Sequence, residues 1–140
     1  MYWRIKMHGK IRFVVQGLGY IALKEHLPAL KSMENVEVVA VVSSSLEHAK
    51  NVAEKFNVKS YYSSLDEALR KEDVDAVDIC TVTYRHKEQC IIAAEHGKHI
   101  FLEKPIALKL KDADEIIQSA RKHGVKLMVG HVLRFFTSYM

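Results

Sequence analysis

The amino-acid sequence predicts an α/β domain built on a doubly wound parallel sheet of about six strands. Short apolar runs alternate with amphipathic segments along the chain, and glycine residues often separate one from the next. Such alternation is typical of parallel strands joined by right-handed helical crossovers, with helices on both faces of the sheet. The 140 residues are enough for one such domain, and an apolar fraction of 49% is ordinary for a globular protein.

The expected strands coincide with the apolar runs at residues 11–15, 36–42, 59–62, 76–82, 99–102 and 125–129. The run at 36–42 carries valine on both faces, as expected for a strand that is covered on both sides. Between the strands, amphipathic segments predict helices at residues 20–33, 46–56, 64–71, 85–96 and from 110 to the glycine at 124.

Apolar side chains recur at helical spacing in three of these segments, which predicts the face that each helix packs on the sheet. The inward positions are expected to be Ile21, Leu27 and Leu30, then Leu46, Ala49, Ala53 and Phe56, then Leu110, Ala113, Ile117 and Ala120. Pro28 interrupts the first helix, because it has no N–H to donate to the carbonyl of Lys24. We expect a kink there, or a break into two short helices.

A glycine turn follows the first strand and fits the pattern G-x-G-x-x-[G/A]. Gly17 allows a sharp turn, Gly19 lets a pyrophosphate approach the backbone, and Ala22 lets the helix pack closely on the strand. The helix N-terminus that follows offers free N–H groups to phosphates. A tight turn without a ligand is the alternative, but this context favours a dinucleotide site formed by Gly17, Leu18, Gly19, Tyr20, Ile21 and Ala22.

The end of the second strand bears on the choice of nicotinamide cofactor. An NAD-preferring domain usually places Asp or Glu there for the ribose 2′-OH, whereas this chain has Ser43, Ser44 and Ser45. No carboxylate would repel a 2′-phosphate, so we expect NADP, with NAD as the alternative. The serines also have a structural interpretation, because Ser44 to Glu47 forms a capping box for the next helix.

Further motifs lie after later strands: Thr81-Val82-Thr83-Tyr84-Arg85-His86, Glu103-Lys104-Pro105 and Gly130-His131-Val132-Leu133-Arg134-Phe135. With the glycine turn and the segment from His26 to Leu30, they resemble the Gfo/Idh/MocA oxidoreductases over about residues 10–136. The resemblance implies a Rossmann-type domain and hydride transfer between a nicotinamide and a sugar, polyol or related hydroxy compound. It also implies Lys104 as the catalytic residue and further cofactor contacts from Thr81, Thr83, His86, Glu103 and Lys104 itself.

Two features depart from the pattern of that family. Val82 and Thr83 stand where proline and asparagine are usual, and His86 could equally be an ordinary residue of a first helical turn. In the family a second α/β domain carries the substrate pocket and an Asp/His pair. We therefore expect an N-terminal extension at 1–10, a dinucleotide-binding domain at 11–130, and at 131–140 the start of a linker to a substrate domain that this sequence lacks.

Several functions remain open at this point. The chain could be the cofactor domain of an oxidoreductase, a stand-alone or truncated NAD(P)-binding module, or an S-adenosylmethionine-dependent methyltransferase, although Glu103-Lys104-Pro105 counts against the last. The net charge of +4 is dispersed, and no apolar run is long enough for a membrane, so we expect neither nucleic acid nor membrane as a partner. We also expect no metal, no disulfide framework from Cys80 and Cys90, a cytoplasmic location, and a homo-oligomer or a partner chain.

Overall fold

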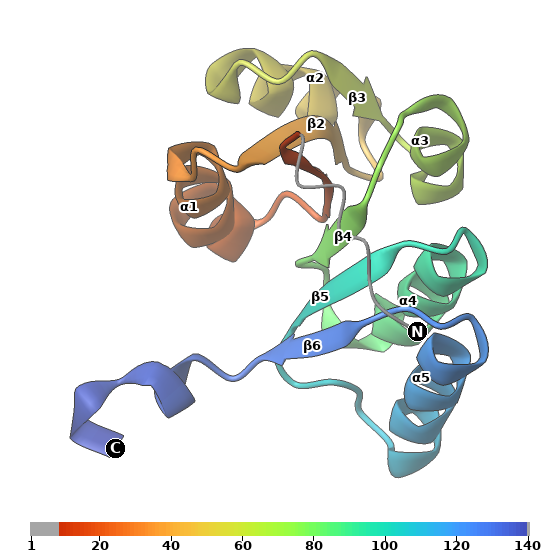
Figure 1. The fold of residues 1–140 in the computed structure, drawn as a ribbon. Coiled ribbons are helices and arrows are strands. Elements are labelled where there is room, and N and C mark those ends of the chain that lie inside the picture. The colour runs from red at the N-terminus through yellow and green to blue at the C-terminus, as the bar shows by residue number, and fades with distance from the viewer. Residues whose placement is uncertain (1–8, 140) are drawn as a thin grey trace.

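The computed structural model describes residues 9–139, and these form a parallel sheet of six strands (Figure 1). The spatial order is β3-β2-β1-β4-β5-β6, so the order changes direction between the central strands β1 and β4. The strands are β1 (Ile11–Gln16), β2 (Val36–Val42), β3 (Ser60–Tyr62), β4 (Ala76–Ile79), β5 (His99–Glu103) and β6 (Leu127–Gly130). The doubly wound parallel sheet predicted from the sequence is confirmed. Residues 1–8 of the predicted extension lie outside the described residues.

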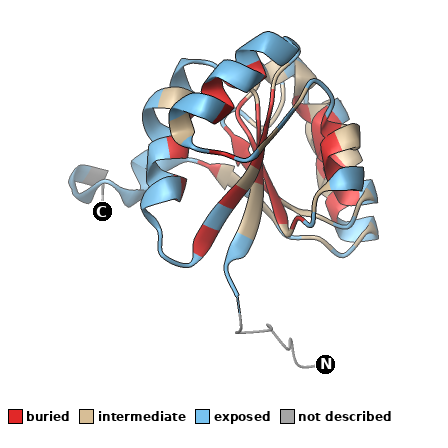
Figure 2. Ribbon diagram, turned by 90° about the horizontal axis from the view of Figure 1, so that it is seen from above, coloured by how far each residue is buried: buried red, intermediate tan, exposed pale blue. Residues whose placement is uncertain are grey.

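Helices cover both faces of the sheet, and the strands between them are its most buried part (Figure 2). One face packs against a π-helix (Ala22–His26), α1 (Leu27–Ser32) and α2 (Leu46–Phe56). The other face packs against α3 (Leu65–Lys71), α4 (His86–Glu95) and α5 (Leu110–Lys122). Each face has its own apolar core, and Val15 belongs to one whereas Val14 belongs to the other. No helix in the described part of the chain is long and apolar enough to cross a membrane.

The helix after the glycine turn is irregular at Pro28, as the sequence predicts. The π-helix ends at His26, where the Leu27 N–H donates to the carbonyl of Ala22, and Pro28 lies in the first turn of α1. At that position the missing N–H of proline breaks no necessary hydrogen bond. The predicted interruption therefore takes the form of a change from π-helix to α-helix between His26 and Leu27.

Two predicted strand limits were wrong by more than one residue, and glycines explain both. β4 ends at Ile79 rather than Val82, because the chain then crosses Gly17 so closely that a Cβ there would lie 2.6 Å from Thr81 Cγ2. β6 begins at Leu127 rather than at 125, because Gly124, with a φ of +65°, ends α5 and the next amide still donates to the carbonyl of Ala120.

Three predicted inward positions were also wrong. Ile21, Leu46 and Leu110 are 38%, 51% and 88% exposed, and each lies in or beside the first turn of its helix. Those first turns follow the carboxyl ends of strands, and these three side chains extend past the sheet instead of packing on it. In α5 the deeply buried residues are Ile116 and Ala120.

Candidate functional site

A cavity of about 330 Å³ opens at the carboxyl ends of β1, β2 and β4. In an open α/β sheet this is the place where ligands bind, because the strand order changes direction there and leaves a crevice between the loops. The cavity is lined by Gln16, Gly17, Leu18, Gly19, Ser43, Ser44, His48, Cys80, Thr81, Val82, Tyr84 and Arg85. Six predicted site residues are thus brought together around it: Gly17, Leu18, Gly19, Ser43, Ser44 and Thr81.

Gly17 and Gly19 of the turn have different surroundings, which give each glycine a different structural role. Gly17 has a φ of +91°, and any Cβ there would collide with the side chain and backbone of Thr81. Gly19 has no heavy atom within 4 Å of the place where its Cβ would stand. Gly17 therefore lets two loops pack together, whereas Gly19 leaves open space beside the cavity, as a site for a bulky anion requires.

The remaining residues of the glycine turn divide between surface and core. Tyr20 is exposed, whereas Ala22 is fully buried and packs in the core between its helix and the sheet. The helical hydrogen bonds begin where the Leu23 N–H donates to the Gly19 carbonyl oxygen, at 3.1 Å. The amides just before Leu23 are therefore at a helix N-terminus, where the backbone favours negative charge.

The predicted capping box at the start of α2 is wrong by one residue. The N-cap is Ser45 instead of Ser44, and its side-chain oxygen accepts a hydrogen bond from the His48 N–H at 3.2 Å. Since a capping box needs Glu or Gln at that third position, no box forms. Ser45 is thus engaged in capping, while Ser43 and Ser44 line the cavity.

The loop after β4 is held by buried polar side chains. Thr81 Oγ1 donates to Gln89 Oε1, and the ring nitrogens of the fully buried His86 lie 3.0 Å from the carbonyl oxygens of Thr81 and Pro105. His86 therefore ties the loop after β4 to the loop after β5 and does not line the cavity. Thr83 begins a short 3₁₀ turn and is not in the lining either.

Glu103 and Lys104 lie at the end of β5, beside the cavity but not in its lining. Glu103 is buried, and its Oε2 accepts a hydrogen bond of 3.0 Å from the backbone N–H of Lys104. Lys104 is exposed, and its peptide bond to Pro105 is cis.

The predictions from sequence missed six of the lining residues: Gln16, His48, Cys80, Val82, Tyr84 and Arg85. Gln16 is the most informative, because it is 6% exposed and its Oε1 has no hydrogen-bond partner among the described residues. A buried polar atom without a partner is rare, and because this one borders a cavity, it is placed to accept a hydrogen bond from a water or a ligand that enters the cavity. A polar residue at the end of the apolar strand β1 was the signal that could have found it.

His48 Nε2 lies 2.9 Å from the Leu18 carbonyl oxygen and connects α2 to the glycine turn.

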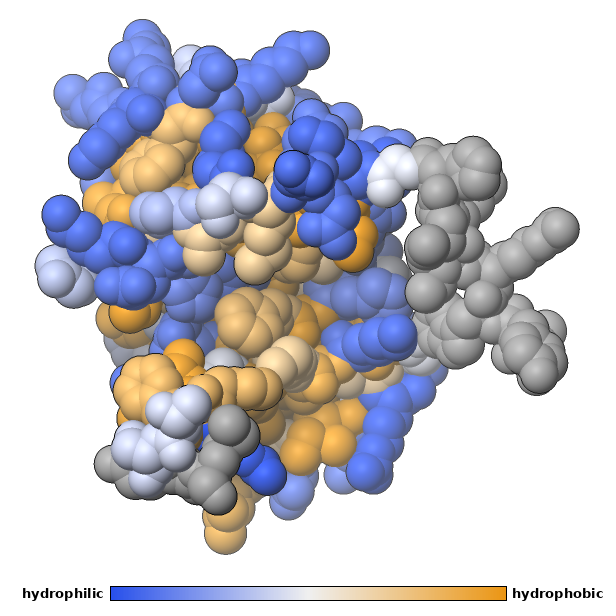
Figure 3. Space-filling view, turned by 60° about the vertical axis from the view of Figure 1, so that its left-hand side comes forward, coloured by the Kyte–Doolittle hydropathy of each residue, from blue (hydrophilic) through white to orange (hydrophobic). Residues whose placement is uncertain are grey.

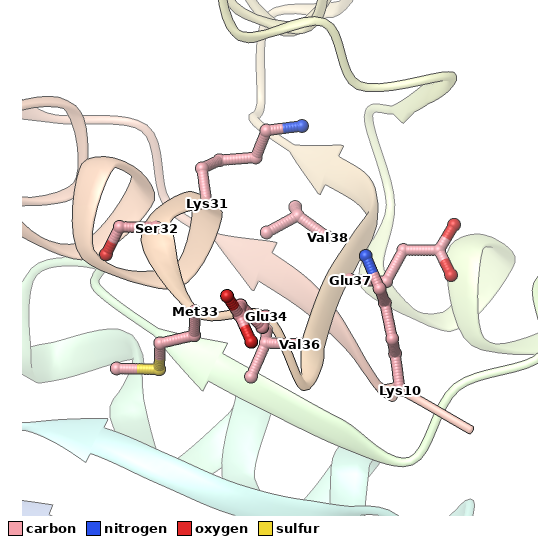
Figure 4. Close-up of a pocket in the computed structure, with 8 residues that line it drawn as sticks. All are labelled: Lys10, Lys31, Ser32, Met33, Glu34, Val36, Glu37 and Val38. Carbon is pink, nitrogen blue, oxygen red and sulfur yellow. The ribbon is translucent and has the colours of Figure 1, made fainter. Parts of the chain in front are cut away.

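A larger cavity of about 470 Å³ lies elsewhere, where α1 ends and β2 begins (Figure 4). Its lining mixes lysine and glutamate side chains around Met33, Val36 and Val38. It lies at the amino ends of the strands, away from the glycine turn and the unpartnered Gln16. Size alone therefore does not identify the binding site in this molecule.

The residues around the smaller cavity fit a dinucleotide. A turn without side-chain obstruction at Gly19 suits a pyrophosphate, hydroxyls of Ser43 and Ser44 suit a ribose or its phosphate, and Gln16 offers an acceptor to a buried donor. The lining includes one arginine and no carboxylate, which favours an anionic ligand.

Comparison with known proteins agrees with this geometry. A family model described as an oxidoreductase family with an NAD-binding Rossmann fold matches residues 11–131. The chain is 39% identical over 129 residues to a 4-carboxy-2-hydroxymuconate-6-semialdehyde dehydrogenase from Sphingobium. It is 34% identical over 129 residues to a scyllo-inositol 2-dehydrogenase (NADP(+)) from Bacillus subtilis. Each alignment covers 92% of this chain.

A similar fold occurs in the crystal structure of scyllo-inositol dehydrogenase from Lactobacillus casei with bound NAD(H) and scyllo-inositol. The TM-score is 0.85, with 26% sequence identity over 93% of this chain. The chain spans only 41% of the Sphingobium protein, 39% of the Bacillus protein and 38% of the Lactobacillus chain. What it matches is thus the N-terminal, cofactor-binding part of longer enzymes.

Proposed function

Because the chain belongs to the Gfo/Idh/MocA oxidoreductase family, we propose that it binds NADP(H) as the cofactor domain of a dehydrogenase. The substrate class would be a sugar, a polyol or a related hydroxy compound, since proteins similar to this chain carry names of that kind. The observation that carries the proposal is the cavity at the strand ends, where the glycine turn meets the unpartnered oxygen of Gln16.

Each part of the site has a task in this function. The backbone from Gly17 to Ala22 holds the pyrophosphate, and Gln16 accepts a hydrogen bond from the buried part of the cofactor. When bound, the nicotinamide supplies the acceptor or donor of hydride. Lys104, at the end of β5, stabilises the oxygen of the reacting hydroxyl and helps to move its proton. The Glu103 carboxylate accepts a hydrogen bond from the backbone N–H of Lys104 and so helps to fix its position.

The preference for NADP over NAD rests on charge and hydroxyl groups near the end of β2. Ser43 and Ser44 present hydroxyls, and Arg85 adds a cation to the same cavity lining. No carboxylate in that lining would repel a 2′-phosphate. NAD is the alternative cofactor, because similar proteins name either one.

A second candidate function is a binding module without catalysis of its own. It is favoured by exposed apolar side chains that follow the carboxyl ends of the strands, among them Tyr84, Leu110 and Phe135, because such a surface is typical of one that another chain covers. In that case a partner chain or a second copy supplies the substrate domain. A cytoplasmic location remains an expectation from the sequence in either case.

Titration of the purified chain with NADPH and NADH, followed by fluorescence or calorimetry, tests the proposal. We expect NADP(H) to bind at least as tightly as NAD(H), and a clear preference for NAD(H) would contradict our interpretation of the serines. Gly19→Leu should abolish binding of both, because a side chain would fill the space of the pyrophosphate. Gly9→Leu is the matched control, since Gly9 also has open space around it but precedes β1.

A further inference from the structure

The side chain of His26 lies between two buried carboxylates. Its Nδ1 is 2.9 Å from Asp78 Oδ2 and 3.1 Å from Asp78 Oδ1, and its Nε2 is 3.0 Å from Glu103 Oε1. The His26 and Glu103 side chains are each 10% exposed, and that of Asp78 is 1% exposed. The ring of His26 also packs on Phe101, with 5.7 Å between the ring centroids.

These contacts join three segments that meet at the candidate site. His26 ends the π-helix that follows the glycine turn, Asp78 lies in the central strand β4, and Glu103 ends β5. The second oxygen of Glu103 accepts the backbone N–H of Lys104 at 3.0 Å. A continuous chain of hydrogen bonds therefore runs from the glycine-turn helix to the lysine backbone.

Protons on His26 and Cys80 satisfy the carboxylate oxygens of this cluster. A doubly protonated imidazole donates to Asp78 on one side and to Glu103 on the other, and the Cys80 thiol donates to Asp78 Oδ1 at 3.4 Å. Asp78, Cys80 and Glu103 are the titratable groups that face the ring from β4, from the residue after it and from β5. Ligand atoms of His26, Asp78 and Cys80 lie within 4.8 Å of one another, but we do not assign a metal, because hydrogen bonds already satisfy each group.

We propose that His26 is a positioning residue, whose protonated ring holds Glu103, and through it the backbone of Lys104, in a fixed place beside the glycine-turn helix. A neutral His26 ring has only one N–H and can donate to only one of the two carboxylates. Asp78 and Glu103 are then neighbouring buried negative charges, and Glu103 is held less firmly. The position of Lys104 then depends on pH. Only the use of Lys104 on a substrate rests on the proposed function; the hydrogen-bonded connection does not.

The direct test is a pH titration of the ¹⁵N-labelled chain by NMR, following the His26 ring and the Lys104 amide together. We expect the Lys104 amide resonance to shift with the same midpoint as the His26 ring, while the amide of Ile116 in α5, on the opposite face of the sheet, does not. Independent midpoints would overturn the proposal. Saturation with one equivalent of Zn²⁺ that displaces the ring proton would overturn it too, in favour of a metal site. The titration needs neither a variant nor a bound cofactor.

The variant His26→Gln gives a second, independent measurement. Hydrogen exchange at the Lys104 amide should become about tenfold faster, because the charge-assisted support of Glu103 is lost. His96→Gln is the matched control, since His96 also bonds one carboxylate, Asp66 at 2.8 Å, but lies before the amino end of β5, at the opposite end of that strand from Lys104. Unchanged exchange in folded His26→Gln would contradict the proposal. If the wild-type chain binds no NADP(H) while the Lys104 amide follows His26, the proposed function fails and the positioning role stands.

Discussion

His26 makes the stability of the fold depend on pH near neutrality. Burial by itself lowers the pKa of His26, but hydrogen bonds and charge from Asp78, and then from Glu103, outweigh it and raise the pKa to about 8. Since this is above the unfolded value of 6.5, the stabilisation is complete below pH 6.5 and is lost as the pH rises through 8. We expect a loss of about 2 kcal/mol in the free energy of unfolding, measured by urea denaturation at pH 6 and pH 9.

The substitution His26→Gln removes the titrating group and should flatten this profile. A variant that kept the full loss between pH 6 and pH 9 would show that another group causes it. The matched substitution His96→Gln should keep the loss that His26 causes, because His26 and its two carboxylate partners stay in place.

Lys104 carries the second prediction at this scale. In an assembly that supplies the substrate domain, Lys104→Ala should lower kcat by about 100-fold and weaken cofactor binding much less, because its charge acts on the reacting oxygen. Steady-state kinetics with saturating substrate, together with an NADPH titration, separates the two effects. A variant with full kcat would contradict the assigned role.

Single residues were predictable from sequence where the backbone itself imposes the residue type. Gly17 belongs to this group, because its positive φ and the loop packed against it exclude a side chain, whereas Gly19 was predicted from the motif alone and has open space around it. Gln16 and His26 were not predicted as site residues, since their roles depend on partners that are distant in sequence, such as Asp78 and Glu103. Spacing along the chain contains no signal for such contacts.

At the scale of elements, the start of α2 separates capping from cofactor binding. Ser45 caps the helix, so Ser45→Ala should lower the free energy of unfolding by about 1 kcal/mol. Ser44→Ala should leave stability unchanged but weaken NADPH more than NADH, because Ser44 lines the cavity. Thermal unfolding and cofactor titration of both variants measure this. A stability loss confined to Ser44→Ala would place the cap at Ser44, where the sequence pattern suggested it.

The type and order of the elements followed from the sequence, whereas their ends did not. Hydrophobic periodicity located each helix, but it cannot tell where the sheet below it stops, and Leu46 and Leu110 were therefore assigned inward. The end of β4 likewise depends on Gly17, which lies some sixty residues earlier in the chain. Contacts between loops, not local propensity, decide these limits.

At the scale of the whole molecule, exposed apolar side chains gather at one edge of the sheet. Most of the large ones among the described residues follow the carboxyl ends of strands: Tyr20, Ile21, Leu46, Val82, Tyr84, Leu108, Leu110, Val132, Leu133, Phe135 and Phe136. Figure 3 brings forward the side toward which the C-terminal segment of Figure 1 extends, and orange side chains spread across its centre and lower part. Such a rim is typical of a surface that another domain or chain covers.

The purified chain should therefore self-associate and show no substantial dehydrogenase turnover with sugars or polyols. Hydride transfer needs a substrate carbon held in line with the cofactor, and an open crevice exposes its charges to water. Light scattering and absorbance of reduced nicotinamide across a panel of polyols measure both properties. Robust turnover by a monomer would contradict this prediction, since it would require a complete active site within these residues.

The two cysteines lie in the cores on opposite faces of the sheet, Cys80 beside β4 and Cys90 in α4. Burial raises the pKa of Cys90 to about 12, and burial followed by the charge of Asp78 raises the pKa of Cys80 as well. Alkylating reagents attack only thiolates, so neither sulfur is reactive while the layers stay closed. Cys80 borders the cavity, however, and Cys90 does not. If an alkylating reagent labels Cys80 but not Cys90, the chain has therefore unfolded locally around the cofactor cavity alone.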